Sequence, residues 1–103
     1  MMNSSYVRID LIFDRPLLRE VRSVAKAAGL TGHTLLPALG GEGANGVWSE
    51  DLVTAAQSKL VFMAVTSGSK SVHFLEALKP LLETHGLVVF TSQVTVVRAP
   101  KFE

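Results

Sequence analysis

The chain has 103 residues, of which 48% are apolar and 18% are charged, and it contains no cysteine. This length predicts a single domain over residues 1–103, with one core and no deep cleft between two lobes. The formal net charge of +1 gives no overall field for nucleic acid, and the lack of cysteine excludes disulfides and cysteine-bound metal clusters. The charged fraction is below the usual value of about 25%, so the chain has little polar surface to spare.

The N-terminal residues have neither the basic region nor the apolar stretch of a secretory signal. No apolar run approaches the roughly 20 residues that cross a bilayer. We therefore expect a cytoplasmic protein without membrane insertion.

Hydrophobic periodicity predicts a strand and then a helix in the first third of the chain. Residues 6–13 alternate, so one face of the strand carries Val7, Ile9, Leu11 and Phe13. Pro16 marks the first turn of the helix, and Gly29 supplies its C-terminal stop. The apolar positions of the helix recur at spacings of three and four residues: Leu17, Val21, Val24 and Ala28.

The remaining elements follow the same alternation of strand and helix. We expect a second strand over 33–39, placed at a sheet edge by Pro37, and a third over 59–66 that is apolar on both faces. A second helix follows Ser67, contains Pro80 and ends at Gly86. Its expected core positions are Val72, Leu75, Leu78 and Leu82, with Phe74 and Leu81 beside them. Segments 87–90 and 93–98 are strand-like, the second being a continuation or a hairpin partner of the first.

The order β-α-β-β-α-β predicts an α+β fold of the ferredoxin-like type, with a four-stranded antiparallel sheet and both helices on one face. This arrangement leaves the second face of the third strand, with Val61, Met63 and Val65, without a cover. Self-association is the simplest cover for this face, and a C-terminal strand folded over part of it is the alternative.

Few residues have the spacing of a catalytic or metal site. The three histidines lack metal-ligand spacing, so we expect no metal site. The chain has no G-x-S-x-G motif, and the carboxylates Glu42, Glu50 and Asp51 are better explained as solvated loop charges than as an acid–base pair. We therefore expect no catalytic residues, no resident cofactor and no enzyme activity.

The long segment 40–58 is the clearest functional feature, since long connections in small domains are usually functional. Its glycines, at positions 40, 41, 43 and 46, allow successive N–H groups to form an anion nest, or serve as a flexible hinge. Trp48 either anchors a partner or pins the loop to its own domain.

A basic stripe lies on the first helix, about opposite its apolar stripe, and consists of Arg15, Arg19, Arg22 and Lys26. We interpret it as a solvated helix face, with an anionic partner as the lesser alternative.

Three segments carry a family resemblance. They are Gly29-Leu30-Thr31-Gly32-His33-Thr34, Gly40–Gly43 and Val94–Arg98. In this order they resemble the G-x-x-G-x-T junction, the glycine-containing base of the mobile T-loop and the final strand of the PII signalling superfamily. The likeness spans most of the chain, and the T-loop would cover about residues 41–58.

The resemblance implies a homotrimer with nucleotide sites in the clefts between subunits. By position, it places Thr34 on the adenine side, Phe62 and Ala64 along the pocket, and Arg98 at phosphate or ribose. The further residues that it gives to the nucleotide site are Gly40, Gly41, Gly43, Gly86 and Val88. The T-loop residues that it offers to a protein partner are Asn45, Trp48, Glu50 and Asp51.

Two departures separate the chain from the nitrogen-regulating members of this family. The segment 83–90 lacks the lysine that holds the outer phosphates, and the loop lacks the tyrosine that is uridylylated in many members. The pattern is closer to divergent PII-like proteins, including those encoded with carboxysomes and bicarbonate transporters.

We therefore expect a PII-like regulator that binds AMP or ADP in preference to ATP, with bicarbonate as a further candidate ligand. Ligand would order the T-loop and so control a protein partner in inorganic carbon metabolism, such as a membrane transporter. The alternative is a ligand-free ferredoxin-like interaction module that uses the Trp48 loop. RNA recognition is disfavoured because the central strands lack paired exposed aromatics.

Overall fold

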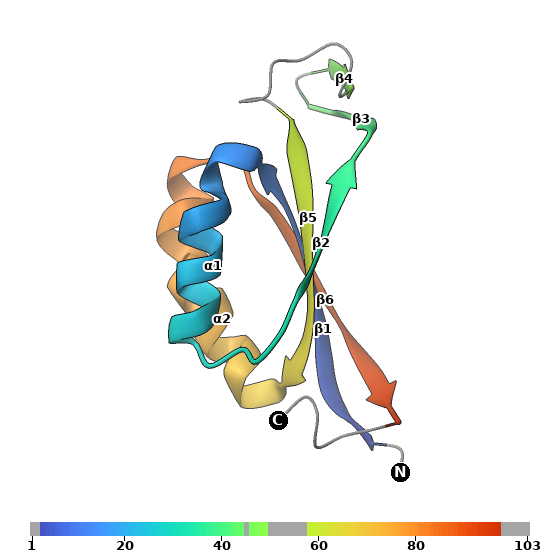
Figure 1. The fold of residues 1–103 in the computed structure, drawn as a ribbon, viewed down its shortest axis with the longest axis vertical. Coiled ribbons are helices and arrows are strands. Elements are labelled where there is room, and N and C mark those ends of the chain that lie inside the picture. The colour runs from blue at the N-terminus through green and yellow to red at the C-terminus, as the bar shows by residue number, and fades with distance from the viewer. Residues whose placement is uncertain (1–2, 45, 50–57, 98–103) are drawn as a thin grey trace.

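The computed structural model describes residues 3–44, 46–49 and 58–97. Four strands form an antiparallel sheet in the order β2-β5-β1-β6, and both helices cover one of its faces (Figure 1). This confirms the expected ferredoxin-like α+β fold. The elements in chain order are β1 (Asn3–Asp14), η1 (Arg15–Leu17), α1 (Leu18–Ala27), β2 (Thr34–Ala38), β3 (Gly40–Gly43), β4 (Gly46–Ser49), β5 (Lys59–Ser67), α2 (Gly68–Thr84) and β6 (Val88–Val96).

The core lies between the helices and one face of the two central strands, β1 and β5. Alternate residues of each strand point into it, as the sequence predicted, and Leu11 lies opposite Phe62 in the register. Phe74 and Leu78 of α2 are fully buried against this face, and so is Val21 of α1. These side chains fix the position of β5, which carries much of the candidate site described below.

The other face of the sheet, which we call the open face, is covered by neither of the two described helices (Figure 1). One row of the register across it runs through Leu36, Val61, Ile12 and Val88. Leu36 and Val88 remain 46% and 53% exposed, as does Phe90 at 53%. The alternative in which the C-terminal strand folds over this face is wrong for the described residues, because 93–96 continue β6 alongside β1.

An ion pair lies within this apolar face. Arg8 donates two hydrogen bonds to Asp10, from Nε to Oδ2 at 2.9 Å and from Nη2 to Oδ1 at 3.0 Å. The Asp10 side chain is 8% exposed and that of Arg8 is 46% exposed. The two-bond geometry satisfies both oxygens of Asp10, as a largely buried carboxylate requires.

The second helix differs from the sequence prediction in its buried face and in its end. Val72 is 56% exposed, whereas Phe74 and Leu78 are fully buried, so the expected core position at Val72 is wrong. This helix carries apolar residues on several sides, so periodicity alone could not distinguish a buried face that includes Val72 from one centred on Phe74 and Leu78. The helix ends at Thr84 and His85 is its extended C-cap, so Gly86 does not terminate it. Neither described helix is both long and apolar enough to cross a membrane.

The long connection after β2 contains a short hairpin that the sequence did not predict. Gly40–Gly43 pairs with Gly46–Ser49 in an antiparallel ladder, and Gly46 adopts a positive φ of 107° at the turn. The hairpin extends beyond the end of the four-stranded sheet (Figure 1). Of the two interpretations of the glycines at positions 40, 41, 43 and 46, the extended pairing of Gly40–Gly43 contradicts the anion nest, because a nest needs residues that alternate in helical sense.

A buried hydroxyl on β5 gives a stability prediction. Thr66 is 2% exposed, and its Oγ1 has no hydrogen-bond partner among the described residues. Replacing Thr66 with valine should raise the free energy of unfolding by about 1 kcal/mol, because the desolvation penalty of the hydroxyl disappears while the shape is kept. Urea denaturation measures the change. Thr66→Ser, which keeps the hydroxyl, should give no gain, and a loss of stability in Thr66→Val would show that the hydroxyl is bonded.

Candidate functional site

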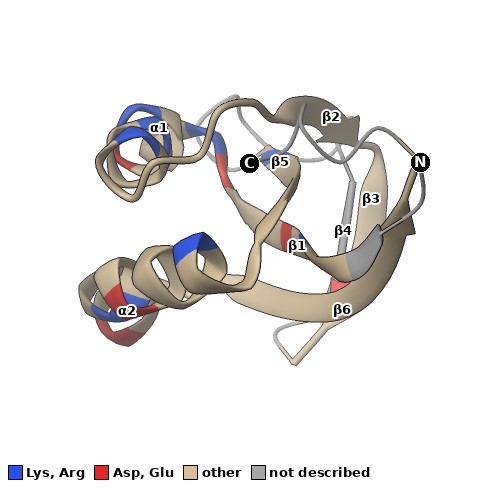
Figure 2. Ribbon diagram, turned by 90° about the horizontal axis from the view of Figure 1, so that it is seen from below, with Lys and Arg blue, Asp and Glu red and all other residues tan. Residues whose placement is uncertain are grey.

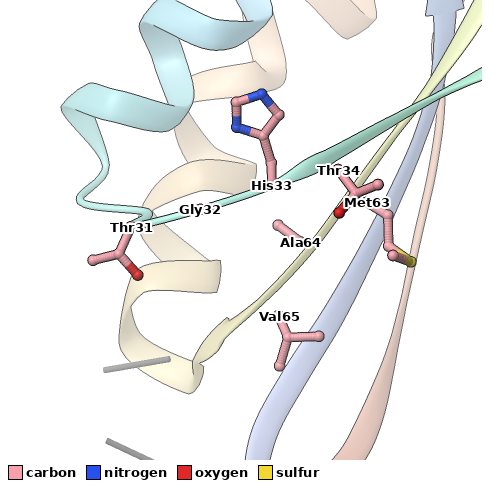
Figure 3. A pocket seen from close by; sticks show the side chains of 7 residues that line it. All are labelled: Thr31, Gly32, His33, Thr34, Met63, Ala64 and Val65. Carbon is pink, nitrogen blue, oxygen red and sulfur yellow. The ribbon is translucent and has the colours of Figure 1, made fainter. Parts of the chain in front are cut away.

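A pocket of about 460 Å³, which we call the edge pocket, lies where β2 begins beside β5. The first pair between these strands is Thr34 with Met63, and β5 continues from Ala64 to Ser67 with no described strand alongside this edge. The lining residues come from the segment before β2, from β2 and from β5: Thr31, Gly32, His33, Thr34, Met63, Ala64 and Val65 (Figure 3).

The edge pocket draws side chains from both faces of the sheet. The His33 ring is turned toward the helices, whereas Thr34, Met63 and Val65 lie on the opposite side (Figure 3). Thr34 and Met63 belong to the open face, where the same row of the register continues through Asp10 to Phe90. The edge pocket therefore lies on the rim of the open face.

His33 is held by aromatic stacking on the core. Its ring centroid lies 4.7 Å from that of Phe62 with an interplanar angle of 17°, and Phe62 in turn lies 5.7 Å from Phe74. Burial lowers the pKa of His33 below its ordinary value of 6.5, and the positive charge of Arg22 lowers it further. Because His33 stacks on Phe62, this wall of the edge pocket packs directly on the core.

The lowered pKa of His33 predicts the sign of a pH effect. Between its pKa in the folded chain and 6.5, the unfolded chain binds more protons at this residue than the folded chain does. Stability should therefore fall as the pH is lowered through that window, and His33→Gln should remove this part of the loss. An NMR titration of the ring should show the lowered pKa directly. Arg22→Gln should raise it, Lys79→Gln on α2 should leave it unchanged, and a pKa at or above 6.5 in the parent chain would contradict the assignment.

The structure brings together some of the residues that the sequence assigned to a nucleotide site. Thr34 and Ala64 both line the edge pocket, and Phe62 lies fully buried next to Ala64 on the helix-facing side. Gly86 precedes β6, and Val88 begins it, at the opposite edge of the sheet. Three strand spacings, about 14 Å, separate that edge from β2.

Other predicted residues lie in or beyond the hairpin. Gly40, Gly41 and Gly43 form β3 and are exposed, and the backbone of Trp48 lies in β4. The residues Asn45, Glu50, Asp51 and Arg98 lie outside the described part of the chain.

The returning end of the long connection is anchored to η1. The Arg15 backbone N–H donates to the Ser58 carbonyl at 2.8 Å, and Arg15 Nε donates to Ser58 Oγ at 2.9 Å. The next residue, Lys59, forms an ion pair with Asp14 at 2.6 Å. These contacts fix the point at which the connection enters β5.

Sequence reasoning missed five pocket residues: Thr31, Gly32, His33, Met63 and Val65. The G-x-x-G-x-T junction contains the first three, but the last two depend on where β2 starts along β5, which no local pattern encodes. The described residues contain no group of three or more side chains able to hold a metal ion.

Comparison with known proteins identifies the family. The family model described as nitrogen regulatory protein P-II matches residues 6–101. A search of curated proteins gives no match.

Three solved structures have a similar fold. CPII, a nitrogen regulatory PII-like protein from Thiomonas intermedia K12 bound to ADP, AMP and bicarbonate, superposes with a TM-score of 0.89 at 22% identity, over 99% of this chain and 96% of that one. A PII-like signalling protein from Thermus thermophilus gives 0.79 at 21% identity, over 95% of each chain. The GlnK–ATP complex from B. subtilis gives 0.64 at 14% identity, over 91% of this chain and 85% of that one. On the family match over residues 6–101, this chain belongs to the nitrogen regulatory protein P-II family.

Proposed function

We propose that this protein is a PII-like regulator that binds AMP or ADP in clefts between the subunits of a homotrimer, with no resident cofactor and no catalytic role. The observation that carries the proposal is the edge pocket on the rim of the open face. A second copy packed on the open face would close this pocket from the side that is now solvent. The CPII structure, which is similar in fold, contains ADP, AMP and bicarbonate.

The residues that the family resemblance gives to one nucleotide site support a site shared between copies. Thr34 and Ala64 lie at the β2 edge of the sheet, whereas Gly86 and Val88 lie at the β6 edge. A single chain separates these two groups by the full width of the sheet. Two copies placed side by side on their open faces would bring one chain's β2 edge toward its partner's β6 edge.

The edge pocket has the size and chemistry for a purine nucleoside. Its volume of about 460 Å³ falls within the usual range of ligand pockets, about 300–1,000 Å³. Met63, Ala64 and Val65 offer an apolar wall for a flat base, and Thr34 offers a hydroxyl. The uncovered edge of β5 offers backbone donors and acceptors, as an edge strand does for an added strand. Arg98 remains the candidate for phosphate and bicarbonate.

The hairpin at β3–β4 is the candidate surface for binding a protein partner. We propose that this partner acts in inorganic carbon metabolism. The hairpin extends beyond the sheet, and ligand at its base would favour one of its conformations. A ligand shifts such an equilibrium only by its difference in affinity for the two states.

Calorimetry with AMP, ADP and ATP, each with and without bicarbonate, tests the nucleotide part of the proposal. We expect saturable binding of AMP and ADP, weaker binding of ATP, and a tighter complex when bicarbonate is present. Absence of binding by all three nucleotides at millimolar concentration would overturn it.

Thr34→Val tests the site assignment. The change keeps the β-branched shape and removes one hydroxyl, so AMP binding should weaken about threefold to tenfold while the fold is unchanged. Arg98→Ala should weaken AMP binding at least as much, because its fork suits phosphate, and light scattering should show the same assembly. Thr91→Val, outside the edge pocket, is the matched control. Undiminished AMP binding in both variants would place the nucleotide elsewhere.

A ligand-free interaction module is the second candidate, and one observation favours it. Leu39 and Val47, at and within the hairpin, are 75% and 72% exposed, and exposed apolar side chains in a protruding element fit a partner surface. Trp48 fluorescence separates the two functions. A change on adding AMP or ADP supports the regulator, and a change with a protein partner alone supports the module.

A further inference from the structure

A second hollow, which we call the α1 groove, adjoins the edge pocket and shares residues 31–33 with it. Its volume is about 270 Å³, and its other wall is the C-terminal half of α1, with Arg22, Ala25 and Lys26. The proposed nucleotide site does not use this wall. The α1 groove is too small for a nucleotide but has ample room for a single oxyanion.

The charge of the α1 groove is positive and is not neutralised by the described part of the chain. Arg22 and Lys26 are one helical turn apart, so they lie on the same side of α1. No ion pair joins either of them to a described carboxylate, and no acidic residue lines the groove. Segment 15–28 holds four Lys and Arg residues and one acidic residue, and Figure 2 shows mostly basic colouring along α1.

The helix dipole stabilises one of these two positive charges, that of Lys26. Lys26 lies in the last turn of α1, where a cation interacts favourably with the terminal carbonyls. Arg22 lies a full turn earlier, and its charge is felt by His33 across the groove. Two like charges four residues apart disfavour a helix unless something compensates them.

Backbone donors add to the side-chain charges. The hydrogen bonds that end α1 stop at Leu30, whose N–H donates to the Ala25 carbonyl at 3.1 Å. The amides of Thr31 and Gly32 follow this bond and precede the first pair of β2, and neither donates to a backbone acceptor among the described residues. A Cβ built on Gly32 would meet no atom within 4 Å, which shows that the space beside this residue is open.

From this juxtaposition we propose that the α1 groove is an anion subsite for a phosphate group, held by the guanidinium of Arg22, the ammonium of Lys26 and the backbone of residues 31–32. The Arg22 fork suits two phosphate oxygens at once, and Lys26 supplies a second charge. The phosphate is either a free oxyanion or the phosphate of a nucleotide whose base occupies the edge pocket. Residues 31–33 line both the edge pocket and the α1 groove, so the two hollows are adjacent.

Titration with inorganic phosphate at constant ionic strength, followed through the NMR signals of the His33 ring, tests the subsite. His33→Gln identifies the signals. In the parent chain we expect a saturable shift. In Arg22→Gln and in Lys26→Gln the affinity should fall about tenfold, the effect of losing a hydrogen bond to a charged group. These side chains are exposed, so circular dichroism should show an unchanged fold.

Arg19→Gln is the matched control, because it removes one charge from the same helix without touching the groove. Its phosphate affinity should stay within twofold of the parent value. A linear, non-saturating shift in the parent chain would overturn the subsite. An equal loss of affinity in all three variants would also overturn the subsite. Such a result would show that phosphate is attracted by the overall positive charge of the helix and not by a defined set of ligands.

A second arm with AMP identifies the source of the phosphate group. If phosphate binds equally well to the AMP-saturated protein, the subsite takes a free oxyanion. If AMP displaces phosphate, and Arg22→Gln weakens AMP about tenfold, the subsite takes the nucleotide's own phosphate. Both results support the subsite. Failure of AMP to bind at all would overturn the proposed function while leaving the phosphate titration as an independent result.

Discussion

Replacing Phe62 with alanine should lower the free energy of unfolding by about 3–5 kcal/mol, the usual cost of deleting a buried aromatic ring. Phe62 is fully buried near the centre of β5, and its ring stacks with the rings of Phe74 and His33. A loss of this size approaches the whole stability of many small domains. Urea denaturation measures it, with all variants at one chain concentration because the proposed assembly would also add stability.

Two control variants show whether the loss comes from the ring's position. Phe62→Leu keeps most of the volume and should cost about 1–1.5 kcal/mol. Val72→Ala removes an apolar side chain that is 56% exposed, and its effect should stay within about 0.5 kcal/mol. If Phe62→Ala cost no more than Val72→Ala, the core would be centred elsewhere.

Replacing Leu36 with glutamate should disperse the proposed homotrimer into single chains. Leu36 lies on the open face beside Val61, in the surface that we propose is buried between copies. Each interface would then bury an unpaired carboxylate, at a cost of several kcal/mol per copy. Light scattering should change from three times the chain mass to the chain mass, with circular dichroism showing the fold retained.

Val72→Glu is the matched control for Leu36→Glu. The two residues are similarly exposed, at 56% and 46%, but Val72 lies on α2, on the covered side of the sheet. Its glutamate variant should keep the mass of the parent assembly. Equal dispersal by both changes, or by neither, would contradict the assignment of the interface to the open face.

The strands and helices could be predicted because their apolar positions alternate with the period of each element. The open face followed from β5, whose two apolar faces cannot both pack on the helices. The β3–β4 hairpin could not be predicted this way, because glycines occupy three of the four positions of β3 and leave no alternation. Val72 was misplaced because the helix carries apolar residues on several sides, and only packing selects Phe74.

Only some residues of the candidate site could be predicted from the sequence. Thr34 and Ala64 came from the family resemblance, and the structure places both at one pocket. Met63 and Val65 could not be found from the sequence, because they line the pocket only where β2 stops pairing with β5. Arg22 was visible as part of a basic stripe, but its position across a groove from His33 depends on how the junction packs against α1.

The most direct test of the central claim is to measure AMP binding by equilibrium dialysis in the parent chain and in Leu36→Glu. A nucleotide site built from two chains requires the assembly, so we predict saturable AMP binding by the parent and at least a tenfold loss in the dispersed variant. Val72→Glu should bind AMP as the parent does. Unchanged AMP binding by dispersed chains would contradict a cleft between subunits, and no binding by the parent would contradict the nucleotide itself.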